Sequence, residues 1–301
     1  MDFKARLADL DVSLDMIMLP LGSAAAPLNQ APHVFLGPPD ERDREIDQIC
    51  ELIRCLSRAG IGLARYNTAL LGHFRTPDRL GRGGARLPSF EYAKFAAHHP
   101  GESAPLTGDE AARLEVARQG PISSDDFWER IDYFLARVVP VAEEYQVRLA
   151  CHPEDPGLGD RSHDGIARVM GTVDGLKKFI TLHESPYHGL NFCVGTVAEM
   201  LEKPGEQIYD IVRYFGERGK IFNLHFRNIR GGFDDFVEVF PDEGDVDMRA
   251  VLQVLKETGY PYMVMPDHVP LIDGEAPQHV AFAFCFGYIR ALMQKLGIED
   301  R

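Results

Sequence analysis

The sequence has no excess of positive charge. Its 301 residues include 32 lysines and arginines against 46 aspartates and glutamates, which gives a formal net charge of −14. Because broad nucleic-acid binding needs a basic face, this charge argues against a nucleic-acid partner. It does not exclude an anionic small substrate, since a metal and a few arginines can reverse the field locally.

The sequence also lacks paired cysteine motifs. Its five cysteines form no CxxC pair and leave one over, which suits a reducing compartment. They are Cys50, Cys55, Cys151, Cys193 and Cys285.

Long apolar runs are missing as well. The first residues, MDFKARLADLDV, lack the apolar core of a signal peptide. The later run MIMLPLGSAAAP is too short, and too interrupted by proline and glycine, to span a membrane. We therefore expect a cytoplasmic protein with no membrane partner.

What the chain does contain is a regular alternation of short apolar stretches and amphipathic helical patterns. Strands are predicted at 14–19, 61–67, 147–152, 188–196, 221–230 and 262–267. Helices are predicted at 43–59, 124–146, 173–182, 207–218 and 248–258. A seventh strand at 280–286, running into a final helix, is a further option.

This alternation implies a parallel sheet. We expect one domain over residues 1–301, a TIM-type (β/α) barrel that is incomplete at its amino end. A doubly wound open sheet is the alternative, but no GxGxxG motif follows an early strand.

Two segments fall outside the alternation. Residues 68–123 hold no regular period and are predicted to be a long loop insertion, rich in arginine and glycine. Such a loop either clamps an anion or is a solvated surface loop. Residues 231–247, GGFDDFVEVFPDEGDVD, are predicted to be an acidic loop.

Polar residues stand at the ends of four predicted strands. They are His152, Cys193, His225 and Asp267. The intervals of 41, 32 and 42 residues between them match one strand, one helix and their loops. Because successive parallel strands place their carboxyl ends on one side of the sheet, we expect these four side chains to converge.

Two imidazoles, a thiolate and a carboxylate suit Mn²⁺, Fe²⁺, Co²⁺ or Zn²⁺, and form too soft a set for Ca²⁺ or Mg²⁺. Structural zinc sites usually draw on close-set ligand pairs, so ligands from separate strands favour an open catalytic site. His268, directly after Asp267, is either a general base in the same cavity or a residue that orients a ligand. Glu154 and Asp155 are partners of the site, acceptors for sugar hydroxyls, or caps of the next loop.

Eight short segments, taken together and in order, resemble the mannonate dehydratase family within the xylose-isomerase-like barrels. They are ARYN (64–67), RT (75–76), GRGGA (81–85), HPEDPG (152–157), FCVGT (192–196), HFRN (225–228), DEGD (242–245) and PDH (266–268). The resemblance implies loss of water from D-mannonate to give 2-keto-3-deoxy-D-gluconate, and a homodimer.

The same resemblance implies roles for individual residues. His152, Cys193, His225 and Asp267 would hold a divalent metal, Mn²⁺ above all, with Fe²⁺ as an alternative. His268 would act in proton transfer, with Arg227 beside it in the catalytic site. The residues implied to contact the sugar acid are Asn67, Arg75, Arg82, Gly84, Asp155 and Asn228.

Three features depart from the family pattern. Val269 and Pro270 follow PDH where the family has glycine and a polar residue, and no tyrosine follows until Tyr288. The amino end is also shorter by about one strand–helix unit. Two alternatives therefore stay open: an isomerase or epimerase of a sugar or sugar acid on the same scaffold, and a non-catalytic sugar-acid-binding homologue.

Overall fold

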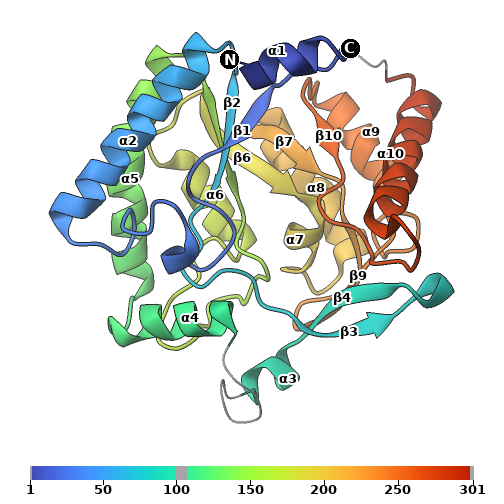
Figure 1. Cartoon of the computed structure of the whole chain (residues 1–301). Helices are drawn as coiled ribbons and strands as arrows, with labels where there is room; N and C mark the ends of the chain where they lie inside the picture. The colour runs from blue at the N-terminus through green and yellow to red at the C-terminus, as the bar shows by residue number, and fades with distance from the viewer. Residues whose placement is uncertain (1, 99–106, 299–301) are drawn as a thin grey trace.

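A curved parallel sheet forms the centre of the molecule in a computed structural model, which describes residues 2–98 and 107–298 (Figure 1). The sheet has six strands, and their order in space is their order along the chain. They are β1 (Met16–Met18), β2 (Leu63–Asn67), β5 (Arg148–His152), β6 (His188–Cys193), β7 (Ile221–His225) and β10 (Val264–Met265).

Every neighbouring pair of these strands is parallel. Within the described residues, β1 and β10 form the two edges and do not pair with each other. The predicted parallel sheet and incomplete (β/α) barrel are therefore confirmed.

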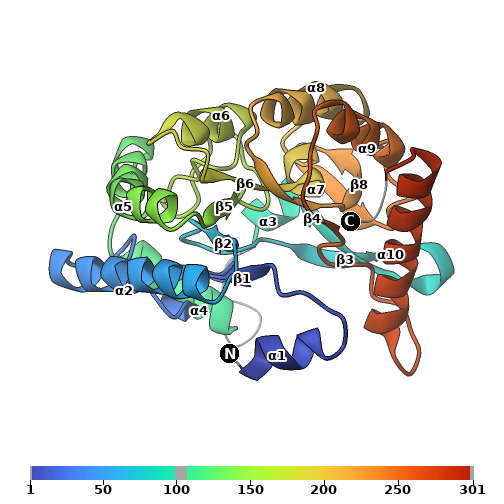
Figure 2. The same cartoon turned by 90° about the horizontal axis from the view of Figure 1, so that it is seen from above.

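Helices cover the outer face of the sheet (Figure 2). They are α2 (Pro39–Arg58), α5 (Ser124–Glu144), α6 (Val173–Thr181), α8 (Pro204–Glu217), α9 (Met248–Glu257) and α10 (Pro277–Lys295). A capping box starts α5, because the Ser123 hydroxyl accepts from the backbone N–H of Asp126 while the Asp126 carboxylate accepts from the N–H of Ser123. Among the described helices, none combines the length and the apolar character that a membrane crossing requires.

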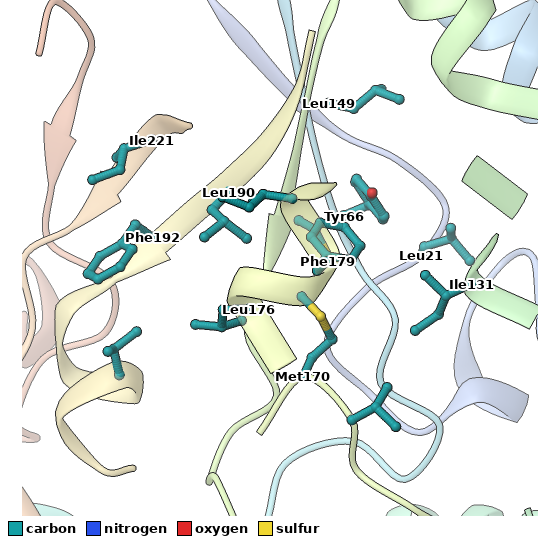
Figure 3. Packing of buried hydrophobic residues seen from close by; sticks show 14 of the residues in the cluster. Leu21, Tyr66, Ile131, Leu149, Met170, Leu176, Phe179, Leu190, Phe192 and Ile221 are labelled. Atoms are coloured by element: carbon teal, nitrogen blue, oxygen red, sulfur yellow. The ribbon is translucent and has the colours of Figure 1, made fainter. Parts of the chain in front are cut away.

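The core lies between the helices and the outward side chains of the strands (Figure 3). Along β2, for example, Tyr66 points outward and packs on Phe134 of α5, with their ring centroids 5.7 Å apart. Ile131, Phe179 and Leu190 are fully buried in the same cluster. Burial of this kind, at roughly 25 cal/mol per Å² of apolar surface, holds each helix against the sheet.

The segment predicted as a seventh strand is helical. Residues 280–286 lie within α10, and Ala281, Cys285 and Ile289 are buried at the four-residue spacing of one helix face. The strand prediction was wrong because a short apolar run such as AFAFCF has no clear period, and only its length and packing decide between helix and strand.

A second, antiparallel sheet lies across the carboxyl ends of the parallel strands, near the short helix α7 (Val194–Ala198) (Figure 1). Its strands, in spatial order, are β3 (Thr76–Leu80), β4 (Arg86–Glu91), β9 (Asp235–Val239) and β8 (Asn228–Gly232). The prediction of one continuous strand over 221–230 was wrong, because the chain leaves the parallel sheet after His225 and enters β8.

The same sheet corrects two further boundaries. The predicted acidic loop 231–247 contains β9, in which Glu238 is buried among apolar residues. The predicted strand 188–196 ends at Cys193, because α7 begins at the next residue.

Residues 68–123 contain secondary structure of their own. Besides β3 and β4 they include a 3₁₀ turn η2 (Arg82–Gly84), α3 (Tyr92–Ala96) and α4 (Gly108–Arg118). Strand β4 pairs with β9, so this segment helps to cover the end of the barrel where the four candidate ligands lie. Two elements near the amino end, α1 (Asp2–Ala8) and η1 (Ala26–Leu28), complete the described structure.

Candidate metal centre

The four candidate ligands meet at one end of the barrel. His152, Cys193 and His225 are the last residues of β5, β6 and β7, and Asp267 follows β10 by two residues. One ligand atom from each side chain lies within 4.8 Å of one atom from each of the others. Parallel register brings them together, since Cys193 is the direct neighbour of His225 across the β6–β7 pair.

Hydrogen bonds and burial orient the two histidines. Nδ1 of His152 lies 2.7 Å from the carbonyl oxygen of Pro153, which places the ring proton there and leaves Nε2 as the unprotonated nitrogen. Burial lowers the pKa of His152 to about 4, so the ring is neutral at physiological pH. His225, whose ring centroid is 5.1 Å from that of His152, has Nδ1 at 3.1 Å from Oδ1 of Asp267.

Cys193 and Asp267 close the cluster. The sulfur of Cys193 accepts a hydrogen bond from the backbone N–H of Thr196 and lies 3.7 Å from Oδ2 of Asp267. Burial acts to raise the pKa of Asp267, but its interactions with His225, which include a hydrogen bond, and with His268 and Arg227 outweigh it and hold this pKa well below its usual range. Deprotonated carboxylate and neutral imidazole are the forms that bind a metal.

A buried guanidinium lies beside the cluster. Arg227 follows β7 by two residues, and its side chain is almost completely buried. Its Nη2 donates to Oδ2 of Asp155 at 2.9 Å and to Oε1 of Glu199 at 2.8 Å, and its Nη1 donates to Oε1 of Glu238 at 3.1 Å. Gly195 makes room for this arrangement, because a Cβ at that position would lie 2.3 Å from Nε of Arg227.

Arg75 joins the same network from the other side. Its Nη1 donates to Oδ1 of Asp155 at 2.6 Å, and its Nε donates to Oε1 of Glu238 at 3.0 Å. A buried charge is tolerated only when it is paired and hydrogen-bonded. The two arginines and the surrounding carboxylates meet that condition together.

The three buried carboxyl groups of the network differ in protonation. Burial would raise the pKa of Asp155 and of Glu238, but Arg75 and Arg227 lower both, that of Asp155 well below its usual range and that of Glu238 to about 2. Burial and the nearby charge of Asp155 instead raise the pKa of Glu199 well above its usual range. The two arginines therefore favour the ionised forms of Asp155 and Glu238, whereas the protonated form is favoured at Glu199.

His268 lies beside the cluster. Because β10 ends at Met265, the chain is free to turn there, and Nε2 of His268 lies 3.3 Å from Oδ2 of Asp267. Its Nδ1 lies 2.6 Å from Oε2 of Glu238, and its Nε2 lies 2.6 Å from Nη1 of Arg227. The side chain is 40% exposed, so it borders both the buried network and solvent.

Burial would lower the pKa of His268, but Glu238 raises it above the ordinary value. A carboxylate on Nδ1 fixes the ring orientation and leaves Nε2 as the nitrogen that exchanges a proton.

The residues implied to contact a sugar acid separate into two groups. Asn67, Arg75 and Asp155 lie at the cluster or in its network; Asn67 is the direct neighbour of His152 across the β2–β5 pair, and its buried Nδ2 has no hydrogen-bond partner among the described residues. The second group consists of Arg82 and Gly84 in η2 and Asn228 at the start of β8.

Arg82 and Gly84 belong to η2, the turn of the β3–β4 hairpin, where Nη1 of Arg82 donates to Oδ2 of Asp242 at 2.7 Å. The amide of Asn228 instead donates to the carbonyl oxygens of Pro241 and Val246, at 3.0 and 2.9 Å. The side chains of Arg82 and Asn228 therefore donate to residues 241–246 and not to the four candidate ligands.

Three charged residues of the site did not emerge from the sequence. Glu238 lies in β9, and an acid flanked by apolar residues in FVEVF was the available signal that it faces inward. Glu199 lies at the end of α7, six residues after Cys193. Arg65 lies on β2, with Nη1 at 3.2 Å from Nε2 of His225, and its alternation with Leu63 and Asn67 predicts an inward side chain.

Comparison with known proteins points to one family. Residues 33–301 match the family model described as D-mannonate dehydratase (UxuA). The chain is 31% identical over 261 residues to a mannonate dehydratase of Thermotoga petrophila, which covers 78% of this chain and 69% of the relative. It is 30% identical over 290 residues to a mannonate dehydratase of Geobacillus thermodenitrificans, which covers 89% of this chain and 75% of the relative.

The fold has a close counterpart among solved structures. The crystal structure of mannonate dehydratase from Streptococcus suis serotype 2 superposes with a TM-score of 0.80 at 24% sequence identity. The match covers 100% of this chain and 84% of that one.

The charge balance of the buried network predicts different costs for two isosteric substitutions. Asp155→Asn removes an ionised partner of two buried arginines and is expected to lower the free energy of unfolding by about 3–5 kcal/mol. Glu199→Gln replaces a carboxyl group whose protonated form is favoured with an uncharged amide, and is expected to cost less than about 1 kcal/mol. Urea unfolding followed by circular dichroism measures both. Equal losses in the two variants would contradict the assigned protonation states.

Proposed function

Because this chain belongs to the D-mannonate dehydratase (UxuA) family, we propose that it is a metal-dependent sugar-acid dehydratase that converts D-mannonate to 2-keto-3-deoxy-D-gluconate and water. The observation that carries the proposal is the convergence of His152, Cys193, His225 and Asp267 within 4.8 Å, with His268 beside them. The choice of substrate rests on the family, and the choice of residues rests on their geometry.

The donor set fits a divalent transition metal. Two imidazoles, one thiolate and one carboxylate are the ligands that such ions prefer, and Mn²⁺ is the ion we propose, with Fe²⁺ as the alternative. Bound by His152, Cys193, His225 and Asp267, the ion would act as a Lewis acid that stabilises negative charge developing on the carboxylate end of the substrate.

The reaction removes a proton from C2 and a hydroxyl group from C3 of the sugar acid. The two leave as one water, and the enol that remains tautomerises to the 2-keto acid. We assign removal of the C2 proton to Nε2 of His268, since Glu238 holds Nδ1 and leaves Nε2 beside Asp267, one of the candidate metal ligands.

Arg227 is assigned to the catalytic site together with His268. Its Nη1 lies 2.6 Å from Nε2 of His268 and 3.6 Å from Oδ2 of Asp267, so it links the proton-exchanging nitrogen to the candidate metal ligands. A buried guanidinium at this point stabilises negative charge without having to reorganise.

Substrate contacts follow from groups that are close to the cluster and incompletely partnered. The buried Nδ2 of Asn67 lacks a hydrogen-bond partner among the described residues, so it is available to a hydroxyl or carboxylate oxygen of the sugar acid. The ion pair between Arg75 and Asp155 fixes both side chains beside the cluster. Arg82, Gly84 and Asn228 receive no substrate role in this proposal, because their contacts lie in the hairpin turn and the acidic segment.

The metal assignment predicts that one cysteine substitution removes the ion while another does not. Cys193→Ala is expected to weaken Mn²⁺ binding by more than the roughly 10–100-fold that loss of an outer hydrogen-bond partner costs. Elemental analysis after dialysis measures the bound metal. Cys55→Ala, which changes an exposed cysteine of α2, is the matched control and should retain it. Full metal retention by Cys193→Ala would reject the assigned site.

The proton-transfer assignment predicts a selective loss of turnover. His268→Ala is expected to lower kcat on D-mannonate about 10²–10⁴-fold while bound Mn²⁺ is unchanged, because a general base contributes about that factor. A colorimetric assay for 2-keto acids measures the rate, and His183→Ala, at an exposed histidine paired with Asp132, is the control.

The unmodified protein separates this proposal from its alternatives. If it holds Mn²⁺ and forms no 2-keto acid from D-mannonate, the dehydratase proposal fails. Exchange of the C2 hydrogen for deuterium without loss of water, read by NMR across a panel of aldonates and uronates, would identify an epimerase or isomerase instead. Binding by calorimetry without exchange or turnover would identify a non-catalytic binding protein.

A further inference from the structure

A cavity lies at the opposite end of the barrel from the four candidate ligands. Its volume is about 930 Å³, and its wall includes residues at the amino-terminal ends of the parallel strands. Gly62 and Leu63 are at the start of β2, Arg148 at the start of β5, and Phe222 at the start of β7. Val264 of the edge strand β10 also lines the cavity, and within the described residues β10 does not pair with the other edge strand, β1.

Aromatic and apolar side chains form much of the wall. Tyr262 packs edge-to-face against both Phe222 and Tyr260, with ring centroids 6.1 and 5.7 Å apart. Tyr262, Met263 and Phe286 are also among the exposed large apolar side chains of the molecule, at 36%, 39% and 52%. Apolar walls with a few polar groups are typical of sites for small organic ligands.

One polar group in the wall, the guanidinium of Arg148, has an N–H without a hydrogen-bond partner among the described residues. The guanidinium of Arg148 stacks on Tyr262, 4.5 Å from the ring centroid. Its Nε is buried without a hydrogen-bond partner, and no described residue forms an ion pair or hydrogen bond with its side chain. Burying a guanidinium N–H without an acceptor costs free energy, which an oxyanion in the cavity would recover.

The other charges in the wall favour an anion as well. Among the described residues that line the cavity, Lys256 carries a further positive charge and Asp15 is the one carboxylate. The ammonium group of Lys256 donates to the carbonyl oxygen of Leu296, and the carboxylate of Asp15 accepts from the hydroxyl of Ser13. In a protein of net charge −14, this cavity therefore has a positive wall.

We propose that this cavity is a second ligand site, which binds a small organic anion with a flat apolar body. Arg148 holds the oxyanion group of the ligand, and Tyr262, Phe222 and Met263 contact its apolar body. The site is distinct from the candidate metal centre in position and in chemistry, since a sugar acid is polar throughout and would leave the aromatic wall uncovered.

A matched pair of probes tests both parts of this recognition. 8-Anilinonaphthalene-1-sulfonate carries a sulfonate on an aromatic body, and N-phenyl-1-naphthylamine has the same body without the charge. Fluorescence titration of the full chain with each probe gives the two affinities. We expect Arg148→Gln to weaken binding of the sulfonate about tenfold or more and to leave binding of the neutral probe unchanged.

Two further variants guard the interpretation. Arg148→Lys keeps the charge but loses the planar fork, so its affinity for the sulfonate should lie between those of the native protein and Arg148→Gln. Arg58→Gln removes an exposed arginine of α2 and should leave both affinities unchanged. Unchanged binding of the neutral probe shows that the cavity is intact in each variant.

Three outcomes would overturn the proposal. The first is equal affinity of the native protein and Arg148→Gln for the sulfonate. The second is displacement of the sulfonate by D-mannonate at metal-saturating conditions, which would place the probe at the other end of the barrel. The third is a change of molecular mass by light scattering in Arg148→Gln without a change in probe affinity, which would make this surface a contact between copies of the chain.

Discussion

Burial of the Arg227 guanidinium is the constraint on which the organisation of the site depends. Its partners come from four separate parts of the chain: Asp155 from the loop after β5, Glu199 from the end of α7, Glu238 from β9 and His268 from the loop after β10. An unpaired charge at this depth would cost several kcal/mol, so each of these segments has to be in place at once. The antiparallel sheet supplies what the barrel alone lacks, because β9 carries Glu238 across the barrel mouth and pairs with both β8 and β4.

Strand order made the four candidate ligands predictable, since parallel strands at regular intervals carry their last residues to one edge. His152, Cys193 and His225 end their strands as that rule requires. This rule could not predict Glu238 and Glu199, because neither ends a parallel strand. Periodicity also failed at α10, where an apolar run is helical, and after His225, where a bend divides one predicted strand into two. Both depend on tertiary packing that a local pattern does not encode.

The arginine-rich insertion shows the same limit within a few residues. Arg75 and Arg82 stand in one glycine-rich segment and have the same chemistry, yet only Arg75 enters the buried network. Strand β3 begins at Thr76 and leads the chain away from the buried network. Arg82, in the turn of the hairpin, therefore pairs with Asp242 instead. Composition left an anion clamp and a solvated loop as alternatives, whereas the register of β3 on β4 decides which arginine lies at the site.

The charges of the side chains around the cluster explain how a strongly acidic protein could bind an acidic substrate, as the proposed function requires. Around the cluster, the guanidinium groups of Arg65, Arg75 and Arg227 face the carboxylates of Asp155, Glu238 and Asp267, while the raised pKa of Glu199 favours its uncharged form. These protein charges cancel. A divalent cation held by the four donors, one of them the thiolate of Cys193, would therefore leave the site positive although the whole chain is at −14. Pairing arginines with carboxylates thus does more than make burial tolerable: it removes the local excess of negative charge that would otherwise repel a sugar acid.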